Sequence, residues 1–193
     1  IDWKNGVENF LEDYHFFIGH QGLSALMQDD YDRSAFDTDL SRLSHVLRQD
    51  PKSGWSERAY SRLLPEQEHL PESMRRRWTY YALYPNTFFD IYPEYMDFFQ
   101  IIPVAPGRSL LRGRSYSLVD QRESRLLTAI KYLNTRINHR VQQEDNQLTK
   151  SVQQGLASGS YQRGILSDKE VLVKHFGNFI RRKVPEANSV WPV

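Results

Sequence analysis

The sequence has 193 residues, 39% of them hydrophobic, and a mean hydropathy of −0.65, values typical of one globular domain. Its 25 Lys and Arg residues balance 24 Asp and Glu residues, and no long block of like charge occurs. We therefore do not expect the protein to bind nucleic acid. It contains no cysteine, which excludes disulfides and cysteine-ligated clusters, and no apolar run approaches the roughly 20 residues of a membrane helix, so we expect a cytoplasmic protein without membrane contact.

The opening segment, residues 7–23, has the pattern of an apolar helix that carries several polar groups. Glu12 and His15 are three residues apart and therefore lie on the same side of a helix. His20 follows five residues after His15, about 140° away on a straight helix, so we expect the helix to end or distort near Gly19. Because this spacing differs from H-E-x-x-H, a zinc peptidase is disfavoured.

The region that follows, residues 28–77, is polar and lacks a sustained period. It predicts irregular segments and short helices, for example over residues 40–47, with a turn at 51–55.

Residues 78–119 are rich in β-branched and aromatic residues, interrupted by turn residues at 85–86 and 106–107. This pattern predicts four strands of an antiparallel sheet. Most aromatic residues between 88 and 99 are expected in the core, because strand alternation lets at most half of them face a ligand such as a quaternary ammonium.

A long amphipathic helix is predicted over residues 122–156, with one apolar stripe at positions 126, 127, 130, 133, 137, 141, 148 and 152. Asp145 fills the gap in this stripe, and Glu144 falls near its edge, so spacing places an acid inward without choosing between them. A buried carboxylate needs a cation, hydrogen bonds or a metal as its partner.

A final helix is predicted over residues 169–183, opened by a capping box at 167–170, with Val173, Phe176 and Ile180 facing inward. The order of the elements predicts a single α+β domain, residues 1–193, of helix-grip type. In such a domain a curved antiparallel sheet wraps around the long helix near the C-terminus and encloses a pocket.

Two imidazoles and one inward carboxylate form the ligand set of a facial iron(II) site that leaves positions open, and zinc accepts similar ligands. The candidates are His15 and His20 with an acid from the long helix. The remaining histidines are expected to be surface or hydrogen-bonded residues, namely His45, His69, His139 and His175.

The segment DWKNGVENFLEDYHFFIGH resembles the opening of the catalytic domain of Rieske non-haem iron oxygenases, the family of aromatic-ring-hydroxylating dioxygenase α subunits and related monooxygenases. The resemblance continues in YYALYPNTFFDIYP and in VQQEDNQLTKSVQQGLASGSYQRGILSDKEVLVKHF. It covers nearly the whole chain and is weakest over residues 28–77.

The resemblance implies a mononuclear Fe(II) bound by His15, His20 and Asp145, and it selects Asp145 over Glu144 because the second acid of the family's Glu-Asp pair binds iron. It implies O2 as co-substrate and a terminal oxygenase that hydroxylates an aromatic ring, as in aromatic hydrocarbon catabolism, or oxidatively demethylates a small substrate such as a quaternary amine. Mono- and dioxygenation both remain open.

Two further residues take roles from the resemblance. Glu12 would be the bridging acid between an iron histidine and a cluster histidine on a neighbouring subunit, and Asn9 matches a polar residue close to the iron. Many members of the family have aspartate at this position, whereas Glu12 is longer. In this respect the sequence is more similar to the branch that acts on quaternary amines.

The larger departure is the N-terminal Rieske domain, whose 2Fe-2S cluster needs two Cys and two His. Because the chain has no Cys, we expect the cluster in an N-terminal domain absent from these residues. The resemblance also implies an NAD(P)H-dependent reductase, acting directly or through a ferredoxin, and a homotrimer in which each cluster serves the adjacent iron.

Two other functions fit the pattern. A non-catalytic helix-grip protein would bind a small ligand and use the same side chains as an internal polar network. A zinc hydrolase would hold zinc and need no oxygen. Metal content separates all three.

Overall fold

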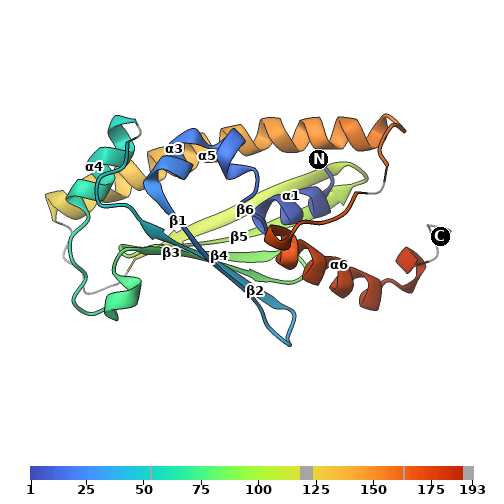
Figure 1. The fold of residues 1–193 in the computed structure, drawn as a ribbon, viewed down its shortest axis with the longest axis horizontal. Helices are drawn as coiled ribbons and strands as arrows, with labels where there is room; N and C mark the ends of the chain where they lie inside the picture. Colours follow the sequence, from blue (N-terminus) through green and yellow to red (C-terminus); the bar gives the residue numbers. More distant parts are fainter. Residues whose placement is uncertain (53, 118–123, 163, 189–193) are drawn as a thin grey trace.

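The fold is built on one six-stranded antiparallel sheet whose strands neighbour each other in chain order (Figure 1). The structure is a computed structural model and describes residues 1–52, 54–117, 124–162 and 164–188. The strands are β1 (Met27–Ala35), β2 (Leu40–Leu47), β3 (Arg77–Leu83), β4 (Thr87–Ile91), β5 (Met96–Ala105) and β6 (Arg108–Tyr116). The α-helices of the described residues are α1 (Trp3–Phe10), α2 (Phe16–Gly19), α3 (Gln21–Leu26), α4 (Trp55–Leu63), α5 (Arg125–Ala157) and α6 (Val171–Lys183).

The four strands predicted over 78–119 are confirmed as β3 to β6, apart from residues 118–119, which lie outside the described residues. Turns occur at both predicted positions, 85–86 and 106–107. Gly107 has φ +67°, in the left-handed region that glycine adopts most readily, so it suits the tight β5–β6 turn.

The helix predicted over 40–47 is wrong, because these residues form strand β2. Four of its five buried side chains alternate as a strand requires, at Ser41, Leu43, His45 and Leu47, and Ser44 is buried on the other face. Two of these four side chains are polar, which removes the alternating hydrophobic signal. The preceding residues, predicted as irregular, pair with β2 as strand β1.

The prediction of a continuous helix before Gly19 is also wrong, since the opening segment forms α1, a turn, and the short helices α2 and α3. The predicted break near Gly19 is confirmed, because α2 ends there. A Cβ at Gly19 would lie 2.6 Å from Cδ1 of Leu148 on α5, so glycine allows the close approach of the two segments. Earlier in the turn, the buried carboxylate of Asp13 accepts hydrogen bonds from Arg33 on β1, at 2.5 Å to each oxygen.

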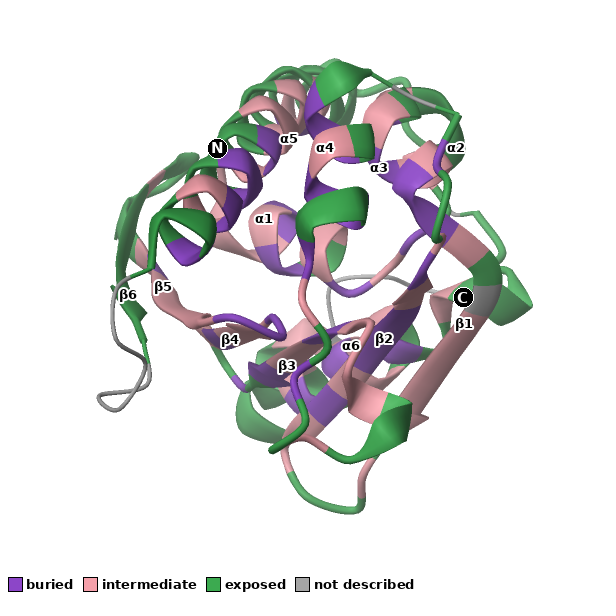
Figure 2. Cartoon of the chain, turned by 90° about the vertical axis from the view of Figure 1, so that its left-hand side faces the viewer, coloured by how far each residue is buried: buried purple, intermediate pink, exposed green. Residues whose placement is uncertain are grey.

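The long helix is confirmed as α5, although residues 122–123 lie outside the described part of the chain. Its first half buries four positions of the predicted stripe, namely Leu127, Ile130, Leu133 and Ile137. The last three pack in one hydrophobic cluster with residues of α3, α4 and the sheet. Figure 2 shows α1, α3, α4 and α5 above the same face of the sheet. The predicted α+β helix-grip architecture is therefore confirmed. Among the described residues, no helix has the length and apolar character required to cross a bilayer.

The capping box at 167–170 is confirmed, and it begins a 3-10 turn, Asp168–Glu170, that leads into α6. Phe176 faces inward as predicted, whereas Val173 and Ile180 are only partly buried. The residues that α6 buries are Leu172, Phe176 and Phe179. They pack against α1 and the sheet in a second hydrophobic cluster.

Glu94, between β4 and β5, is a buried acid with a raised pKa. Its side chain is 1% exposed and accepts hydrogen bonds from Asn134 at 2.7 Å and from the Tyr60 hydroxyl at 3.0 Å. Burial is the largest cause and raises the pKa of Glu94 from 4.5 to about 7, although these two hydrogen bonds lower it.

The protonated carboxyl of Glu94 should make stability depend on pH. The native state holds its proton between pH 4.5 and about 7, so the free energy of unfolding falls as the pH rises through that interval, by about 3 kcal/mol in total. The Glu94→Gln variant does not titrate there and should lose this part of the slope. Urea unfolding of both proteins across the interval measures it, and parallel pH profiles would contradict the assignment.

Candidate metal centre

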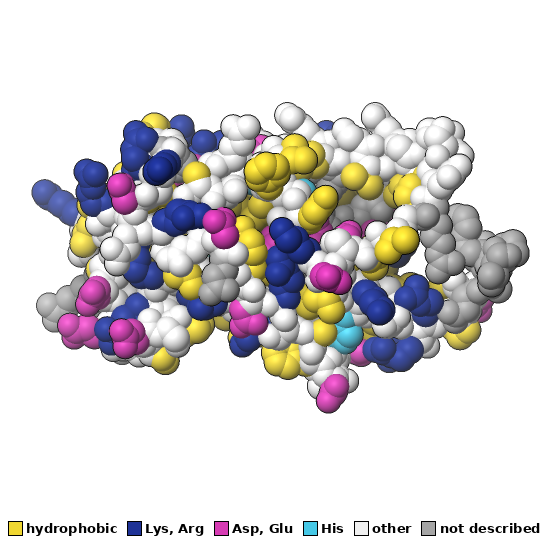
Figure 3. All heavy atoms as spheres, viewed as in Figure 1, with side chains coloured by type: hydrophobic (Ala, Val, Ile, Leu, Met, Phe, Trp, Pro, Cys, Tyr) yellow, Lys and Arg dark blue, Asp and Glu magenta, His cyan; other side chains and the backbone are white. Residues whose placement is uncertain are grey.

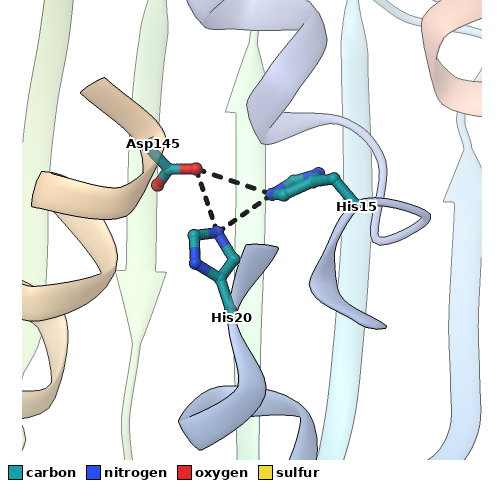
Figure 4. A group of neighbouring side chains, drawn as sticks. All are labelled: His15, His20 and Asp145. Atoms are coloured by element: carbon teal, nitrogen blue, oxygen red, sulfur yellow. Dashed lines mark hydrogen bonds and ion pairs between the residues drawn. The ribbon is translucent and has the colours of Figure 1, made fainter. Parts of the chain in front are cut away.

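Three side chains from separate elements converge on one point: His15 from the turn before α2, His20 between α2 and α3, and Asp145 from α5 (Figure 4). Nε2 of His15 lies 3.1 Å from Nε2 of His20. Oδ1 of Asp145 lies 3.0 Å from Nε2 of His20 and 3.5 Å from Nε2 of His15. The three residues predicted as metal ligands are therefore neighbours in space.

These separations suit a single metal ion. Two ligand atoms about 2.1 Å from one ion lie about 3.0 Å apart at a right angle and about 3.4 Å apart at a tetrahedral angle. Two imidazole nitrogens and one carboxylate oxygen form the facial set found in non-haem iron(II) sites, and zinc accepts the same atoms. The side chains present thus fit the group that the sequence predicts.

The outer nitrogens of both imidazoles are bound by carboxylates. Nδ1 of His15 donates to Oε1 of Glu12 at 2.5 Å, and Nδ1 of His20 donates to Oε2 of Glu144 at 2.7 Å. Because an ionised carboxylate only accepts, each Nδ1 carries a proton, and a neutral ring then directs the lone pair of Nε2 toward the shared point. Carboxylate partners of this kind orient metal-binding histidines.

The carboxylates around the two imidazoles favour the protonated form of His15. Burial lowers the pKa of His15, but hydrogen bonds with Asp145 and Glu12 outweigh it and raise the pKa to about 9. For Asp145, burial raises the pKa, and the hydrogen bonds with His15 and His20 more than offset it, which leaves this pKa below its usual range. Three carboxylates surround two imidazoles, so a divalent cation that displaces the proton from Nε2 of His15 would be favoured electrostatically.

Asn9, predicted to be close to the iron, donates from Nδ2 to Oδ1 of Asp145 at 2.8 Å. It lies in the last turn of α1, and His15 follows in the turn before α2. Asn9 therefore fixes the carboxylate oxygen that faces both imidazoles.

The expectation that His45 is a surface or hydrogen-bonded residue is wrong. It is fully buried on β2, and neither ring nitrogen has a hydrogen-bond partner among the described residues. Burial, with the nearby charges of Arg33 and Arg77, lowers the pKa of His45 to about 3, so the ring is neutral. It packs against Phe16 with ring centroids 5.4 Å apart and takes no part in the cluster.

The sequence offers Glu144 only as an alternative to Asp145 and does not predict its contact with the outer nitrogen of His20. Its position beside Asp145 near the stripe edge was the available signal, because both acids then reach the same side of α5. In the structure both contact His20, Glu144 at the outer nitrogen and Asp145 at the inner one.

Removing the Glu144 carboxylate should weaken metal binding without abolishing it. We expect Glu144→Ala to lower iron(II) affinity about 10- to 100-fold, because the His20 ring loses the acceptor that orients it. Anaerobic iron(II) titration measures the change. Glu186→Ala, an exposed acid in the C-terminal 3-10 turn, is the control, and an unchanged affinity in Glu144→Ala would contradict the orienting role.

A cavity of about 770 Å³ opens beside the cluster, between α1, α5 and the inner face of the sheet. Aromatic side chains line it, including Phe10, Tyr80, Tyr92 and Phe99. Figure 3 shows hydrophobic side chains gathered below α5 around a hollow in this face of the molecule. The volume of the cavity lies in the range of small-molecule sites, which span about 300–1,000 Å³.

Comparisons with known proteins identify a matching sequence family and solved structures of similar fold. The sequence model of one family, described as ring hydroxylating alpha subunit (catalytic domain), matches residues 1–186. Solved structures of a quaternary ammonium Rieske monooxygenase, CntA, are similar in fold. An inhibitor complex has a TM-score of 0.64 at 18% identity and a complex with L-carnitine has 0.62 at 19%, each covering 96% of this chain. The chain spans about half the length of these structures, 47% and 45%. No match is found among curated proteins.

Proposed function

Because the chain belongs to the ring-hydroxylating α subunit (catalytic domain) family, we propose that it is the oxygen-activating part of a Rieske-type terminal oxygenase. The family implies an oxidoreductase that uses non-haem iron. The finer assignment is that His15, His20 and Asp145 hold one mononuclear Fe(II). The observation that carries it is the convergence of two Nε2 atoms and one carboxylate oxygen within 4.8 Å of one another.

Bound iron(II) would supply the reductive activation of dioxygen beside an organic substrate. The chain's own residues prepare this site. Glu12 and Glu144 hold the two imidazoles with their Nε2 atoms inward, and Asn9 fixes the Asp145 carboxylate. The aromatic walls of the cavity would position an apolar part of the substrate by shape.

The electrons are proposed to come from a Rieske cluster outside residues 1–193, because the chain has no cysteine to hold one. Glu12 is the proposed link to that cluster. Its carboxylate binds His15 and its side chain remains 16% exposed, so a histidine of a neighbouring subunit could reach it. A homotrimer supplied by an NAD(P)H-dependent reductase, directly or through a ferredoxin, would complete the path.

The proposed reaction is hydroxylation of an aromatic ring or oxidative demethylation of an amine. The aromatic lining of the cavity supports both, since it suits a planar ring and also binds a cation through its π faces. The similar structures include complexes of a quaternary ammonium monooxygenase with L-carnitine and gamma-butyrobetaine, which supports a substrate that carries a cationic nitrogen without fixing its degree of methylation.

Iron content and electron supply together test this function. Residues 1–193 are expected to bind one equivalent of iron(II) but not to consume dioxygen repeatedly with NADH and a reductase alone. Adding a Rieske donor domain should restore substrate-dependent consumption. A ligand carrier would hold no stoichiometric iron and a zinc hydrolase would retain zinc, whereas sustained turnover without the donor domain would contradict the proposed electron path.

A further inference from the structure

Two acidic side chains lie in the wall of the cavity, away from the three-residue cluster. Asp90 on β4 and Asp97 on β5 are directly opposite each other in the sheet register, and both line the cavity. Like charges facing each other across two strands destabilise a sheet. Burial, with the charge of Asp97 as a second cause, raises the pKa of Asp90 well above its usual range, and burial also raises the pKa of Asp97.

The two carboxylates differ in how they are bonded. Asp97 accepts a hydrogen bond from the Ser115 hydroxyl at 2.5 Å, and Oδ2 of Asp90 accepts one from the Tyr92 hydroxyl at 3.2 Å. Oδ1 of Asp90 is shielded from solvent and has no hydrogen-bond partner among the described residues. A buried acceptor without a donor is costly, so this atom has the character of a ligand contact.

Among the described residues, no Lys or Arg pairs with either aspartate. Arg114 and Lys150 also line the cavity, yet within the described parts of the chain neither forms an ion pair with Asp90 or Asp97. The nearest neighbours of Asp90 on the sheet are aromatic or acidic: Tyr80 pairs with it on β3 and Asp97 on β5.

Aromatic rings complete the surroundings of the pair. Phe88 and Phe99 stack with centroids 5.0 Å apart two residues along from Asp90 and Asp97. Tyr92 follows Asp90 on the same face, and its hydroxyl is held by Asn138 of α5 at 2.8 Å. Carboxylates among π faces form a site for an organic cation.

We propose that Asp90 and Asp97 bind the ammonium group of a protonated amine, which donates an N–H to Oδ1 of Asp90. The proposal deepens the proposed function, because it rests on this cavity being the substrate site. A quaternary ammonium has no N–H and would leave Oδ1 unpaired. The site therefore favours primary, secondary or tertiary amines, and its aromatic walls take the apolar part of the molecule.

The test is a binding series on the purified protein with three probes that share a phenylethyl group: 2-phenylethylamine, its N,N,N-trimethyl derivative and 2-phenylethanol. Isothermal titration at neutral pH should show the amine bound at least about tenfold more tightly than either of the others, the ratio expected for one charge-assisted hydrogen bond. Equal or tighter binding of the trimethyl derivative overturns the hydrogen bond to Oδ1. Equal binding of the alcohol, or no binding of the amine, overturns recognition of the charge.

Variants identify the residues responsible. Asp90→Asn keeps the side-chain size and should abolish the preference for the amine over the alcohol, and Asp97→Asn should weaken amine binding several-fold. Asp37→Asn, an exposed acid beyond the end of β1, is the matched control and should change nothing. A preference retained in Asp90→Asn overturns the proposal. Iron(II) binding, measured in the parent protein and in each variant, tests the metal centre separately from amine binding. If the parent protein binds no iron(II), the oxygenase function is contradicted, but the conclusion on amine binding is unaffected.

Discussion

Replacing His20 or Asp145 by Ala is expected to lower iron(II) affinity at least about 100-fold, because loss of an outer partner alone costs about 10- to 100-fold. Each substitution removes an atom that faces the shared point, and the remaining two atoms cannot form the facial set. His20 is 0% exposed, so its loss also leaves the Glu144 carboxylate without its imidazole partner. Metal analysis after anaerobic reconstitution measures the effect.

His139→Ala is the control for these variants, since His139 lies exposed on the same helix as Asp145. It should retain one equivalent of iron. Circular dichroism of each variant checks that the fold is retained. Full iron occupancy in both His20→Ala and Asp145→Ala would refute the ligand assignment.

The largest loss of stability is expected from Trp78→Ala, at about 4 kcal/mol. Trp78 on β3 is fully buried, its indole N–H donates to the Tyr60 hydroxyl at 2.9 Å, and its ring packs edge-on against Tyr92 with centroids 4.8 Å apart. Truncation would leave a cavity where α4, α5 and the sheet meet. Urea unfolding followed by circular dichroism gives the free energy.

Two variants bracket this result. Trp78→Phe keeps an aromatic ring but loses the hydrogen bond, so it should cost less than Trp78→Ala. Trp55, 52% exposed at the start of α4, contacts Arg136 by a cation–π interaction, and Trp55→Ala should cost no more than about 1 kcal/mol. A Trp78→Ala variant no less stable than Trp55→Ala would contradict the assigned core.

Sequence patterns predicted the elements whose own residues show a clear period. The stripe of α5 and the β-branched and aromatic runs of β3 to β6 are of this kind. Residues 40–47 have a helical pattern although they form strand β2, because Ser41 and His45 occupy inward positions, while Leu40, Leu43 and Leu47 have helical spacing. Burial of polar residues by tertiary contacts cannot be deduced from such a pattern.

The site was predictable in part for a similar reason. The spacing of His15 and His20 required a break in the helix, and the break occurs at Gly19. Spacing did not separate Glu144 from Asp145, since both acids reach His20 from α5, one on each ring nitrogen. The paired acids in the cavity wall gave no sequence signal, because their opposition depends on the register of two neighbouring strands.

Anomalous diffraction at the iron absorption edge, from crystals grown with iron(II) without oxygen, tests the metal centre most directly. The result expected is one iron peak within about 2.2 Å of the two histidine Nε2 atoms and a carboxylate oxygen of Asp145. A peak at any other position, or its absence from a fully reconstituted crystal, would contradict it.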